Sequence, residues 1–305
     1  MAHSYGYRLK KDFQKHTWVY IMAIPMVVYY ILFHYMPMYG AVIAFKKYTP
    51  ALGIGKSPWV GMKNFRNFFK SVYFGRLVKN TLLINLKLLV FGFPIPIIFA
   101  ILLNEIRSKG FLKGIQTISY LPHFVSTMVL CGMIVDFCSR DGIVTQAAQL
   151  FGAANSNLLL KPQNYQPIYV VSDIWQTMGW NSIIFYAAIT GIDQQLYEAA
   201  DMDGATRFQK MLHVTLPGIK QTVVIMLILR IGQMMSLGYE KTILLYNANT
   251  YETADVISSY VYRKGLLEFD YSYSTAIGLF NSVINFVMLV FANTISKKFN
   301  DTSLW

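Results

Sequence analysis

Charged residues are scarce in this sequence, and acidic residues are the scarcest. Only 14% of the 305 residues are charged, with 15 Asp and Glu against 27 Lys and Arg. With 54% hydrophobic residues and a mean hydropathy of +0.38, the chain is too apolar for a soluble globule of this length. It is therefore predicted to be an integral membrane protein. Its basic excess then faces lipid headgroups, which leaves no reason to predict nucleic-acid binding.

Cysteine and metal-ligand patterns are also sparse. Cys131 and Cys138 are seven residues apart in one apolar run, and on a helix that separation is about 10 Å, too far for a disulfide. The five histidines match no HExxH or similar metal-ligand spacing. We therefore predict no catalytic residue, no metal site and no cofactor on this chain.

One short motif resembles the end of a phosphate-binding loop, the GIGKS at 53–57. The full motif needs a glycine at position 50, where this chain has Pro50, and Pro58 follows at once. It also needs a preceding strand and a following helix N-terminus that aims N–H groups at phosphate. We predict a turn here and no nucleotide site.

Long apolar runs are abundant. A bilayer core of about 30 Å needs roughly 20 mainly apolar residues per helix, and continuous runs favour helices over barrel strands. Prolines within the runs predict kinks, at Pro25, Pro94, Pro96 and Pro122. We predict an all-α membrane protein with six transmembrane helices, at residues 18–44, 81–103, 115–137, 167–191, 222–237 and 274–295.

The first span decides the predicted orientation. Lys and Arg residues number 12 on the side of the N-terminus and 13 on the opposite side, so the total decides nothing. Arg8, Lys10, Lys11 and Lys15 precede the first span, and the first span usually dominates insertion. We therefore predict cytoplasmic N and C termini.

The chain divides into three parts. Residues 1–80 hold the N-terminal tail, the first span and an external segment. Residues 81–295 hold the other five spans and include a cytoplasmic loop at 192–217, and 296–305 form a cytoplasmic tail. The external segment interleaves aromatic and basic residues, which favours an amphipathic helix on the outer leaflet, with a soluble-core helix as the alternative. The residues concerned are Phe65, Phe68, Phe69, Phe74, Lys63, Arg66, Lys70 and Arg76.

Four charged residues lie inside predicted spans, where charge is costly and usually faces a partner or a wet cavity. Lys87, Asp136, Asp173 and Arg230 all fall in the outer halves of their spans, and the inner halves of the second, fourth and sixth spans carry no charge. This pattern predicts a cavity that opens outward and is closed toward the cytoplasm.

The connector after the fourth span, LYEAADMDGATRFQKMLHVTLPG at 196–218, is polar and interrupted by glycine. It reads as a short helix capped by Asp193 or Gln194, a sharp turn at Gly204, and a second short helix. Leu216-Pro217 is expected to end that second helix before the fifth span. The predicted orientation places the connector in the cytoplasm.

The spacing in this connector resembles the EAA loop of permease subunits in binding-protein-dependent ABC importers. Glu198-Ala199-Ala200 is followed after three residues by Gly204 and after nine more by Val214-x-Leu216-Pro217, with Val where Ile is commoner. The stretches YLPHF (120–124), YETADVISSYVYRKGL (251–266) and YSYSTAIGLFNSVIN (271–285) resemble the oligosaccharide branch of the maltose-type permeases, the LplB-like group. The resemblance covers nearly the whole chain and implies the type I permease fold.

The resemblance implies a set of partners. A permease of this group pairs with a second permease subunit, works with two copies of a cytosolic ATPase and receives carbohydrate from an extracytoplasmic solute-binding protein. It crosses the cytoplasmic (inner) membrane of a prokaryote several times, in contact with membrane lipid. ATP and Mg²⁺ belong to the ATPase, so this chain would be a transport subunit and not an enzyme.

The resemblance also implies which residues couple transport to ATP. In the family the EAA loop seats in a cleft of the ATPase, so Glu198 would pair with a basic group there, and small side chains would allow close approach. The residues assigned to ATPase coupling are Glu198, Ala199, Ala200, Asp203, Gly204, Leu216 and Pro217. The alternative is a surface loop that packs only on its own spans.

Substrate contacts are predicted from polar and aromatic side chains within the spans. Sugars are bound by planar hydrogen-bonding groups and aromatic platforms, and in maltose-type permeases the spans on both sides of the EAA loop line the sugar site. The candidates are Asp173, Trp175, Gln176, Trp180, Asn181, Gln233, Tyr239, Glu240, Asn281 and Asn285. For each, a hydrogen bond between helices or a contact with the second permease subunit is an alternative.

Three other functions are weighed against the carbohydrate importer. A secondary transporter driven by an ion gradient would show inverted repeats with broken helices, and no such pair of segments is visible. A membrane enzyme would need converging catalytic carboxylates, and Asp136, Asp173 and Asp255 do not cluster in the sequence. An ABC importer for a non-sugar solute shares the EAA loop and stays open.

Overall fold

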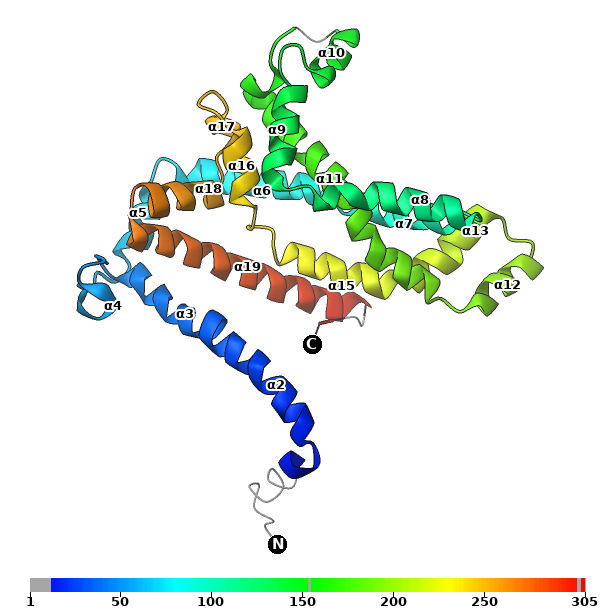
Figure 1. Cartoon of the computed structure of the whole chain (residues 1–305), viewed down its shortest axis with the longest axis horizontal. Coiled ribbons are helices and arrows are strands. Elements are labelled where there is room, and N and C mark those ends of the chain that lie inside the picture. Colours follow the sequence, from blue (N-terminus) through cyan, green and yellow to red (C-terminus); the bar gives the residue numbers. More distant parts are fainter. Residues whose placement is uncertain (1–11, 153–154, 301–302, 305) are drawn as a thin grey trace.

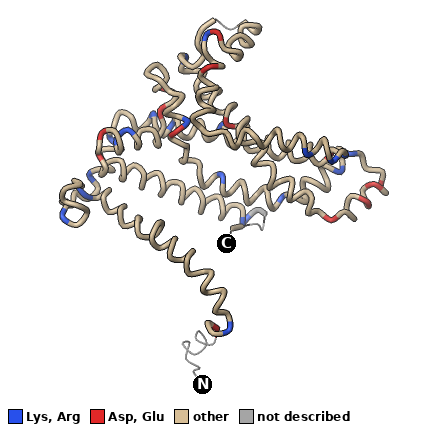
Figure 2. Tube along the Cα trace, in the orientation of Figure 1, with Lys and Arg blue, Asp and Glu red and all other residues tan. Residues whose placement is uncertain are grey.

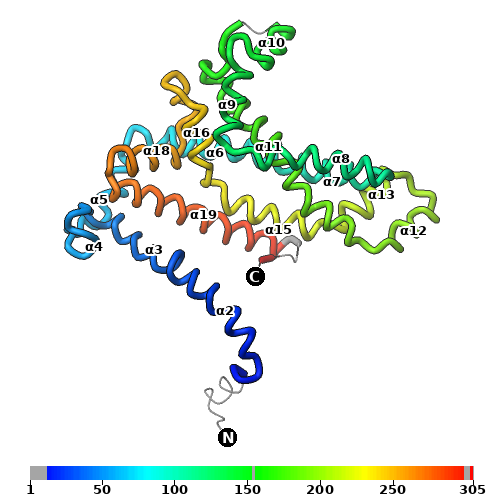
Figure 3. The backbone as a smooth tube through the Cα atoms, viewed as in Figure 1, coloured from blue at the N-terminus to red at the C-terminus, as the bar shows by residue number. Residues whose placement is uncertain are grey.

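The computed structural model describes residues 12–152, 155–300 and 303–304. Arg8, Lys10 and Lys11, which precede the first predicted span, lie outside the described residues. The described part is helical throughout (Figures 1 and 3), apart from loops and one isolated antiparallel bridge between Lys46 and Trp59. The predicted all-α architecture is confirmed.

The first part of the chain forms one apolar helix, an external segment and a second long helix. Short π-helical or 3₁₀ turns join the α-helices. The elements are α2 (Thr17–Tyr30), η1 (Ile31–Tyr35), α3 (Met36–Met38), η2 (Tyr39–Phe45), α4 (Gly53–Lys56), α5 (Lys63–Lys70), α6 (Phe74–Lys87), η3 (Leu88–Gly92) and α7 (Pro94–Asn104).

The middle of the chain contains the longest central helix, α11, and the polar connector that follows it. The elements are α8 (Lys109–Tyr120), η4 (Leu121–Phe124), α9 (Thr127–Phe137), α10 (Ile143–Leu150), η5 (Leu158–Leu160), α11 (Pro162–Thr190), α12 (Gln194–Met202), α13 (Arg207–Lys210), η6 (Met211–Thr215) and α14 (Leu216–Gly218).

The last part of the chain contains two longer helices, α15 and α19. The short helices between them in the sequence lie beside α6 and α9. The elements are α15 (Lys220–Ile231), α16 (Tyr239–Leu245), α17 (Tyr251–Ala254), α18 (Ile257–Tyr262), η7 (Arg263–Leu267) and α19 (Tyr271–Asn300).

Three of the predicted spans coincide with helices long and apolar enough to cross a membrane, Thr17–Phe45, Phe74–Asn104 and Tyr271–Lys298. Two bent helix pairs meet the same standard only when each pair is taken as one span, which gives up to five by length and composition. α11 covers the fourth predicted span with 29 residues, but the polar residues along it keep it outside this group. The prediction of six spans therefore exceeds what length and hydropathy support in the described residues.

The third predicted span, 115–137, is not one continuous helix. The chain bends by 97° between Lys109–Phe124 and Thr127–Phe137. Pro122 lies in the 3₁₀ turn at the bend, and the Ser126 hydroxyl caps α9 by accepting a hydrogen bond from the Val129 N–H. The proline predicted a kink within one helix. Because Ser126 caps the start of α9, the segment instead consists of two separate helices.

The fifth predicted span, 222–237, is also shorter than predicted, since α15 ends at Ile231. Gly232 lies so close to α19 that a Cβ there would be 2.7 Å from the Leu289 Cδ1 atom. The helix ends beside this contact, and residues Gln233–Gly238 form a loop that leads to α16.

The first helix stands apart from the other helices (Figure 1). In its most apolar 18-residue window no residue is buried within the chain. Only its C-terminal end packs inward, where Ala44 joins Phe65 and Ala276 in a small core. The apolar surface of α2 is thus left for lipid or another subunit to cover.

The aromatic residues of the external segment are divided between core and surface. Phe65 and Phe68 on α5 are buried, and Phe68 lies edge-on to Phe74 and Phe280. Phe69 is exposed. The two buried rings join α5 to α19, so this helix packs into the protein to a greater extent than an outer-leaflet helix would.

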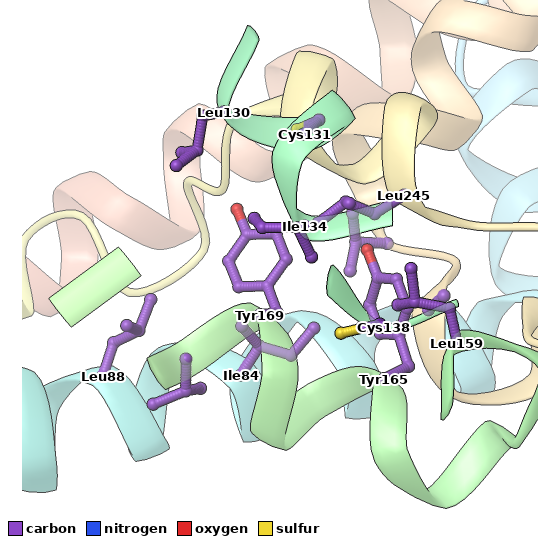
Figure 4. Packing of buried hydrophobic residues seen from close by; sticks show 13 residues of the cluster. Ile84, Leu88, Leu130, Cys131, Ile134, Cys138, Leu159, Tyr165, Tyr169 and Leu245 are labelled. Atoms are coloured by element: carbon purple, nitrogen blue, oxygen red, sulfur yellow. The ribbon is translucent and has the colours of Figure 1, made fainter. Parts of the chain in front are cut away.

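The largest core surrounds the N-terminal half of α11. Tyr165 and Tyr169 face Ile134 of α9 and Leu245 of α16, with Ile84 beneath them (Figure 4). Cys131 and Cys138 also lie in this cluster as free thiols. α11 thereby connects the helices before it in the sequence with the helices after it.

A buried carboxylate joins the short helices to α6. Asp255 is 0% exposed and accepts hydrogen bonds from Arg263 at 2.9 and 2.7 Å, from Ser259 at 2.8 Å and from Arg76 at 3.3 Å. Burial alone would lower the pKa of Arg263, but its hydrogen bonds to Asp255 and Tyr246 outweigh burial and raise the pKa above its ordinary value. The cluster holds 251–267 against the start of α6.

Two helices meet at backbone distance where Gly179 of α11 faces α8. A Cβ at Gly179 would lie 2.1 Å from the Ser119 carbonyl oxygen, and backbone cannot move aside as a flexible side chain can. We predict that Gly179→Ala lowers the free energy of unfolding by about 1–3 kcal/mol or more, measured by thermal unfolding of the purified protein in detergent.

The matched control is Gly132→Ala, at a helix-interior glycine of α9 where a Cβ meets nothing within 4 Å. This variant should be neutral or stabilised by up to about 1 kcal/mol. Equal losses of stability in the two variants would show that the clash with the Ser119 backbone is not the cause of the destabilisation.

Candidate functional site

The connector, together with the residues 192–195 that precede it and cap its first helix, forms two short helices at one end of the molecule, where charged residues also gather (Figures 1 and 2). Asp193 caps α12 by accepting from the Gln195 N–H at 3.0 Å. Gly204 has a φ of +73° and turns the chain toward α13, a conformation in which a residue with a Cβ is strained. Both the predicted cap and the predicted turn are confirmed.

Two side-chain contacts lock α12 to the segment that follows it. Lys210 and Asp201 form a salt bridge at 2.7 Å, and the Tyr197 hydroxyl lies 3.0 Å from Thr215 Oγ1. Thr206 and Gln209 complete a capping box at the start of α13. The two helices therefore form one preorganised unit.

The EAA residues lie on the outer surface of this unit. Glu198 and Ala199 are exposed and Ala200 is half-buried. Within the described part of the chain, Glu198 has no salt bridge or hydrogen bond, and Asp203 is likewise exposed. Large apolar side chains beside them are exposed too, at Leu196, Met202, Phe208 and Leu212.

Leu216-Pro217 lies at the end of the second helix, as predicted, since that helix stops at Gly218. The helical run continues from Arg207 to Gly218 and bends by 60° before Lys220–Ile231. Pro217 lies in the first turn of α14, after a π-helical turn, where its missing N–H costs little. Leu216 packs into the core with Ile219 and Phe185, so it anchors the connector to the bundle.

A polar cavity of about 490 Å³ separates the connector from the bundle. It is lined by charged side chains of both signs, Glu105, Arg107, Asp201, Arg207 and Lys210. The connector is thus held at its two ends with water-accessible space beneath it.

The GIGKS segment forms a single helical turn, α4, whose first residue has a φ of +65°. The Nζ atom of Lys46, which precedes the segment, donates to the carbonyl of Ile54 within it at 2.6 Å. No strand precedes it in the described residues, so the predicted turn is confirmed.

The described residues hold no group of three or more His, Cys, Asp and Glu placed to bind a metal.

Two adjacent cavities of about 460 and 400 Å³ lie between α11 and the α15–α16 segment. They share Leu88, Asp173 and Arg230. Six of the ten predicted substrate contacts line one or both of them: Asp173, Gln176, Asn181, Gln233, Tyr239 and Glu240.

Asp173 is held by a lysine that sequence reasoning did not select. Lys241 is 5% exposed, and its Nζ lies 3.4 Å from Asp173 Oδ1, 3.3 Å from the Tyr169 carbonyl oxygen and 4.5 Å from the Tyr169 ring centroid. This three-way contact joins α16 to α11. Lys241 lies in the loop region after the predicted fifth span, so no intramembrane charge pattern pointed to it.

The other four predicted contacts lie outside these cavities. Trp175 lines an apolar groove between α9 and α11, and Trp180 stacks on His123 with ring centroids 4.5 Å apart. Asn285 donates to Ser236 Oγ at 2.8 Å and accepts from the Met235 N–H at 2.9 Å, which holds the loop after α15. The Oδ1 atom of Asn281 is buried without a hydrogen-bond partner.

The four intramembrane charges do not converge on one cavity. Asp173 and Arg230 line the same space, but Lys87 donates to Gln166 Oε1 at 2.7 Å. Asp136 is exposed near the end of α9. The two cavities are thus lined by two acids, Asp173 and Glu240, and by two cations, Arg230 and Lys241.

A family model matches residues 92–301, and it describes the binding-protein-dependent transport system inner membrane component. The chain belongs to this family. The family is one of membrane transport components and not of enzymes, so an ion-gradient transporter and a membrane glycan transferase are no longer competing explanations. The EAA connector lies within the matched residues.

Two relatives from Bacillus subtilis are similar to this chain over almost their whole length. It is 42% identical over 289 residues to the polygalacturonan/rhamnogalacturonan transport system permease protein YteP of Bacillus subtilis (strain 168), covering 94% of this chain and 90% of that one. Protein LplB of the same organism is 42% identical over 298 residues, covering 97% and 92%.

A solved structure shows the same fold. It is the crystal structure of a bacterial alginate ABC transporter in complex with an alginate pentasaccharide-bound periplasmic protein. One of its chains is 41% identical to this chain with a TM-score of 0.88, over 97% of this chain and 100% of that chain. The ABC importer permease fold is thereby confirmed.

The ion pair between Lys241 and Asp173 yields a stability prediction. We expect Lys241→Met to lower the free energy of unfolding by about 2 kcal/mol, since it leaves Asp173 and the Tyr169 carbonyl without their donor. Thermal unfolding in detergent measures the loss. The exposed Lys264–Glu268 pair supplies the control, and Lys264→Met should cost less than about 1 kcal/mol.

The double variant Lys241→Met/Asp173→Asn decides whether the pair acts as a unit. It should lose less stability than the two single variants together, because no charge is then left unpaired. Losses that simply add would contradict an ion pair that shapes the cavity.

Proposed function

We propose that this chain is one permease subunit of an ATP-driven importer that carries an oligosaccharide across the cytoplasmic membrane of a prokaryote. A second permease subunit, two copies of a cytosolic ATPase and an extracytoplasmic solute-binding protein complete the importer. ATP and Mg²⁺ act on the ATPase, and this chain provides passage and coupling. Both termini and residues 192–218 face the cytoplasm.

The observation that carries the proposal is the full-length match to the alginate importer chain, which was solved with an oligosaccharide-bound periplasmic protein. The name of YteP, which specifies a polysaccharide transport system, supports a carbohydrate substrate. The cavities between α11 and α15–α16 support the same class, since amide, hydroxyl and charged side chains line them.

Coupling is assigned to the connector. Its two helices are locked together by Lys210–Asp201 and Tyr197–Thr215, so a force applied to α12 moves the unit as a whole. Glu198 is left free to pair with a basic group of the ATPase, and Ala199 and Ala200 let the two surfaces approach closely. Movement of the connector would then switch access to the cavity between the two sides of the membrane.

The unpacked first helix and the open side of the cavities support a second subunit. α2 buries none of its apolar window within this chain. The described residues that line the cavities come only from the segment η3 to α7, from α9, from α11 and from the segment α15 to α16. We propose that the partner permease forms the opposite wall.

Glu198 offers the sharpest test of coupling. We expect Glu198→Lys to reduce the amount of ATPase that co-purifies with the two permease subunits by at least about tenfold, because a like charge would face the ATPase. The readout is the ratio of ATPase to permease after affinity purification, together with oligosaccharide uptake into proteoliposomes.

Asp141→Lys is the matched control, an acid-to-lysine change at an exposed position before α10 and far along the chain from the connector. It should leave ATPase recovery within about twofold of the native ratio. The proposal is contradicted by full ATPase recovery with Glu198→Lys, or by uptake that continues when ATP is exhausted.

A further inference from the structure

Arg230 is a charged residue without an ionic partner in the cavity between α11 and α15. It lies near the end of α15, a helix whose sequence KQTVVIMLILRI is otherwise apolar from Val223 onward. Its side chain lines both cavities together with Asp173 and Leu88. A half-buried guanidinium is costly in such a place unless it meets an anion.

The bonding of Arg230 leaves most of its donors unused. Its Nη2 donates to Asn85 Oδ1 at 3.3 Å. No carboxylate of the described residues lies within the 4.0 Å that defines a salt bridge to Arg230. A guanidinium carries five N–H donors, so one long contact to a neutral amide satisfies a small part of its capacity.

Asn85 positions the guanidinium without neutralising it. Asn85 is fully buried, and its Nδ2 donates to the Thr81 carbonyl at 3.0 Å, which leaves Oδ1 fixed toward Arg230. The arrangement orients the arginine and keeps its positive charge available.

The two acids that line these cavities, Asp173 and Glu240, form no salt bridge with Arg230 in the described residues. Asp173 is engaged by Lys241 at 3.4 Å, and Lys241 is itself buried against Tyr169. Glu240 is exposed in the first turn of α16 and forms no ion pair within the described chain. Arg230 is therefore the cation of these cavities that has no carboxylate of the described residues within salt-bridge distance.

We propose that Arg230 binds a carboxylate of the transported oligosaccharide, and hence that the substrate is an acidic sugar chain built from uronic acids. This inference rests on the proposed function. Arginine and a carboxylate can form two parallel hydrogen bonds, which neutral sugar hydroxyls cannot match. Thr177, Asn181 and Gln233 line the same cavity and supply hydrogen bonds to hydroxyl groups.

The experiment compares two probes with the same sugar chain, trigalacturonic acid and its fully methyl-esterified form, in which a neutral methyl ester replaces each carboxylate. Each is titrated calorimetrically into the purified complex of both permease subunits and the ATPase, without the solute-binding protein. Binding is then a property of the membrane cavity. Native protein should bind the acid at least about tenfold more tightly than the ester.

Arg230→Gln should weaken binding of the acid by about tenfold or more and change binding of the ester by less than about twofold. Arg230→Lys should restore part of the affinity, because charge returns without the bidentate geometry. The control Lys220→Gln removes a cation from the exposed start of the same helix and should leave both affinities unchanged.

Several results would overturn the assignment. They are equal binding of acid and ester by native protein, no binding of either, an equal loss for both probes in Arg230→Gln, or failure of that variant to assemble with the second permease subunit. The last result would show that Arg230 pairs with an acid of the partner subunit.

The proposed function is tested separately, by ATP-driven uptake into proteoliposomes with the solute-binding protein present. Uptake of neutral oligosaccharides that is untouched by Arg230→Gln would leave the importer proposal standing and remove the assignment of Arg230. Absence of uptake of any oligosaccharide would remove the importer proposal itself.

Discussion

The packing of α11 against the helices on its two sides is the constraint on which the rest of the structure depends. Its N-terminal half places Tyr165 and Tyr169 into a core shared with α6, α9 and α16. Its middle meets α8 at backbone distance through Gly179, and its C-terminal half packs on α7 through Phe185 and Ile189. Displacement of this helix would therefore disturb the core, the cavity and the connector together.

Charge is used sparingly, and the two buried charged residues among those described, Asp255 and Lys241, each have an ionic partner. Asp255 holds two arginines at the start of α6, and Asp173 holds Lys241 beside the cavity. Both clusters join segments far apart in the sequence, so they stabilise the tertiary arrangement and not individual helices. Arg230 differs from Asp255 and Lys241, because it is half-buried in the wall of the cavity and its one hydrogen-bond partner is the neutral amide of Asn85.

Local chemistry in the sequence predicts the connector well, since a cap at Asp193 and a turn at Gly204 depend only on neighbouring residues. It also predicts the helical class and the three spans that coincide with single long apolar helices, Thr17–Phe45, Phe74–Asn104 and Tyr271–Lys298. Local sequence does not reveal geometry that depends on contacts between residues far apart in the chain. The 97° break after Phe124, the pairing of Lys241 with Asp173, and the placement of Trp175 and Trp180 away from the cavities follow from packing between helices. Coupling roles at Glu198, Ala199 and Ala200 remain predictions that binding experiments must decide.

The unbroken length of α11 has a mechanical consequence. With 29 residues the helix is about 43 Å long at ~1.5 Å per residue. Gly179 meets the Ser119 backbone six residues from Asp173 and eleven from Thr190, beside the connector. If the helix tilts about this contact as a rigid rod, a displacement at the connector end moves Asp173 in the opposite direction by about half the distance. The helix then works as a lever that pivots at Gly179, where the absence of a side chain lets α11 touch the Ser119 backbone.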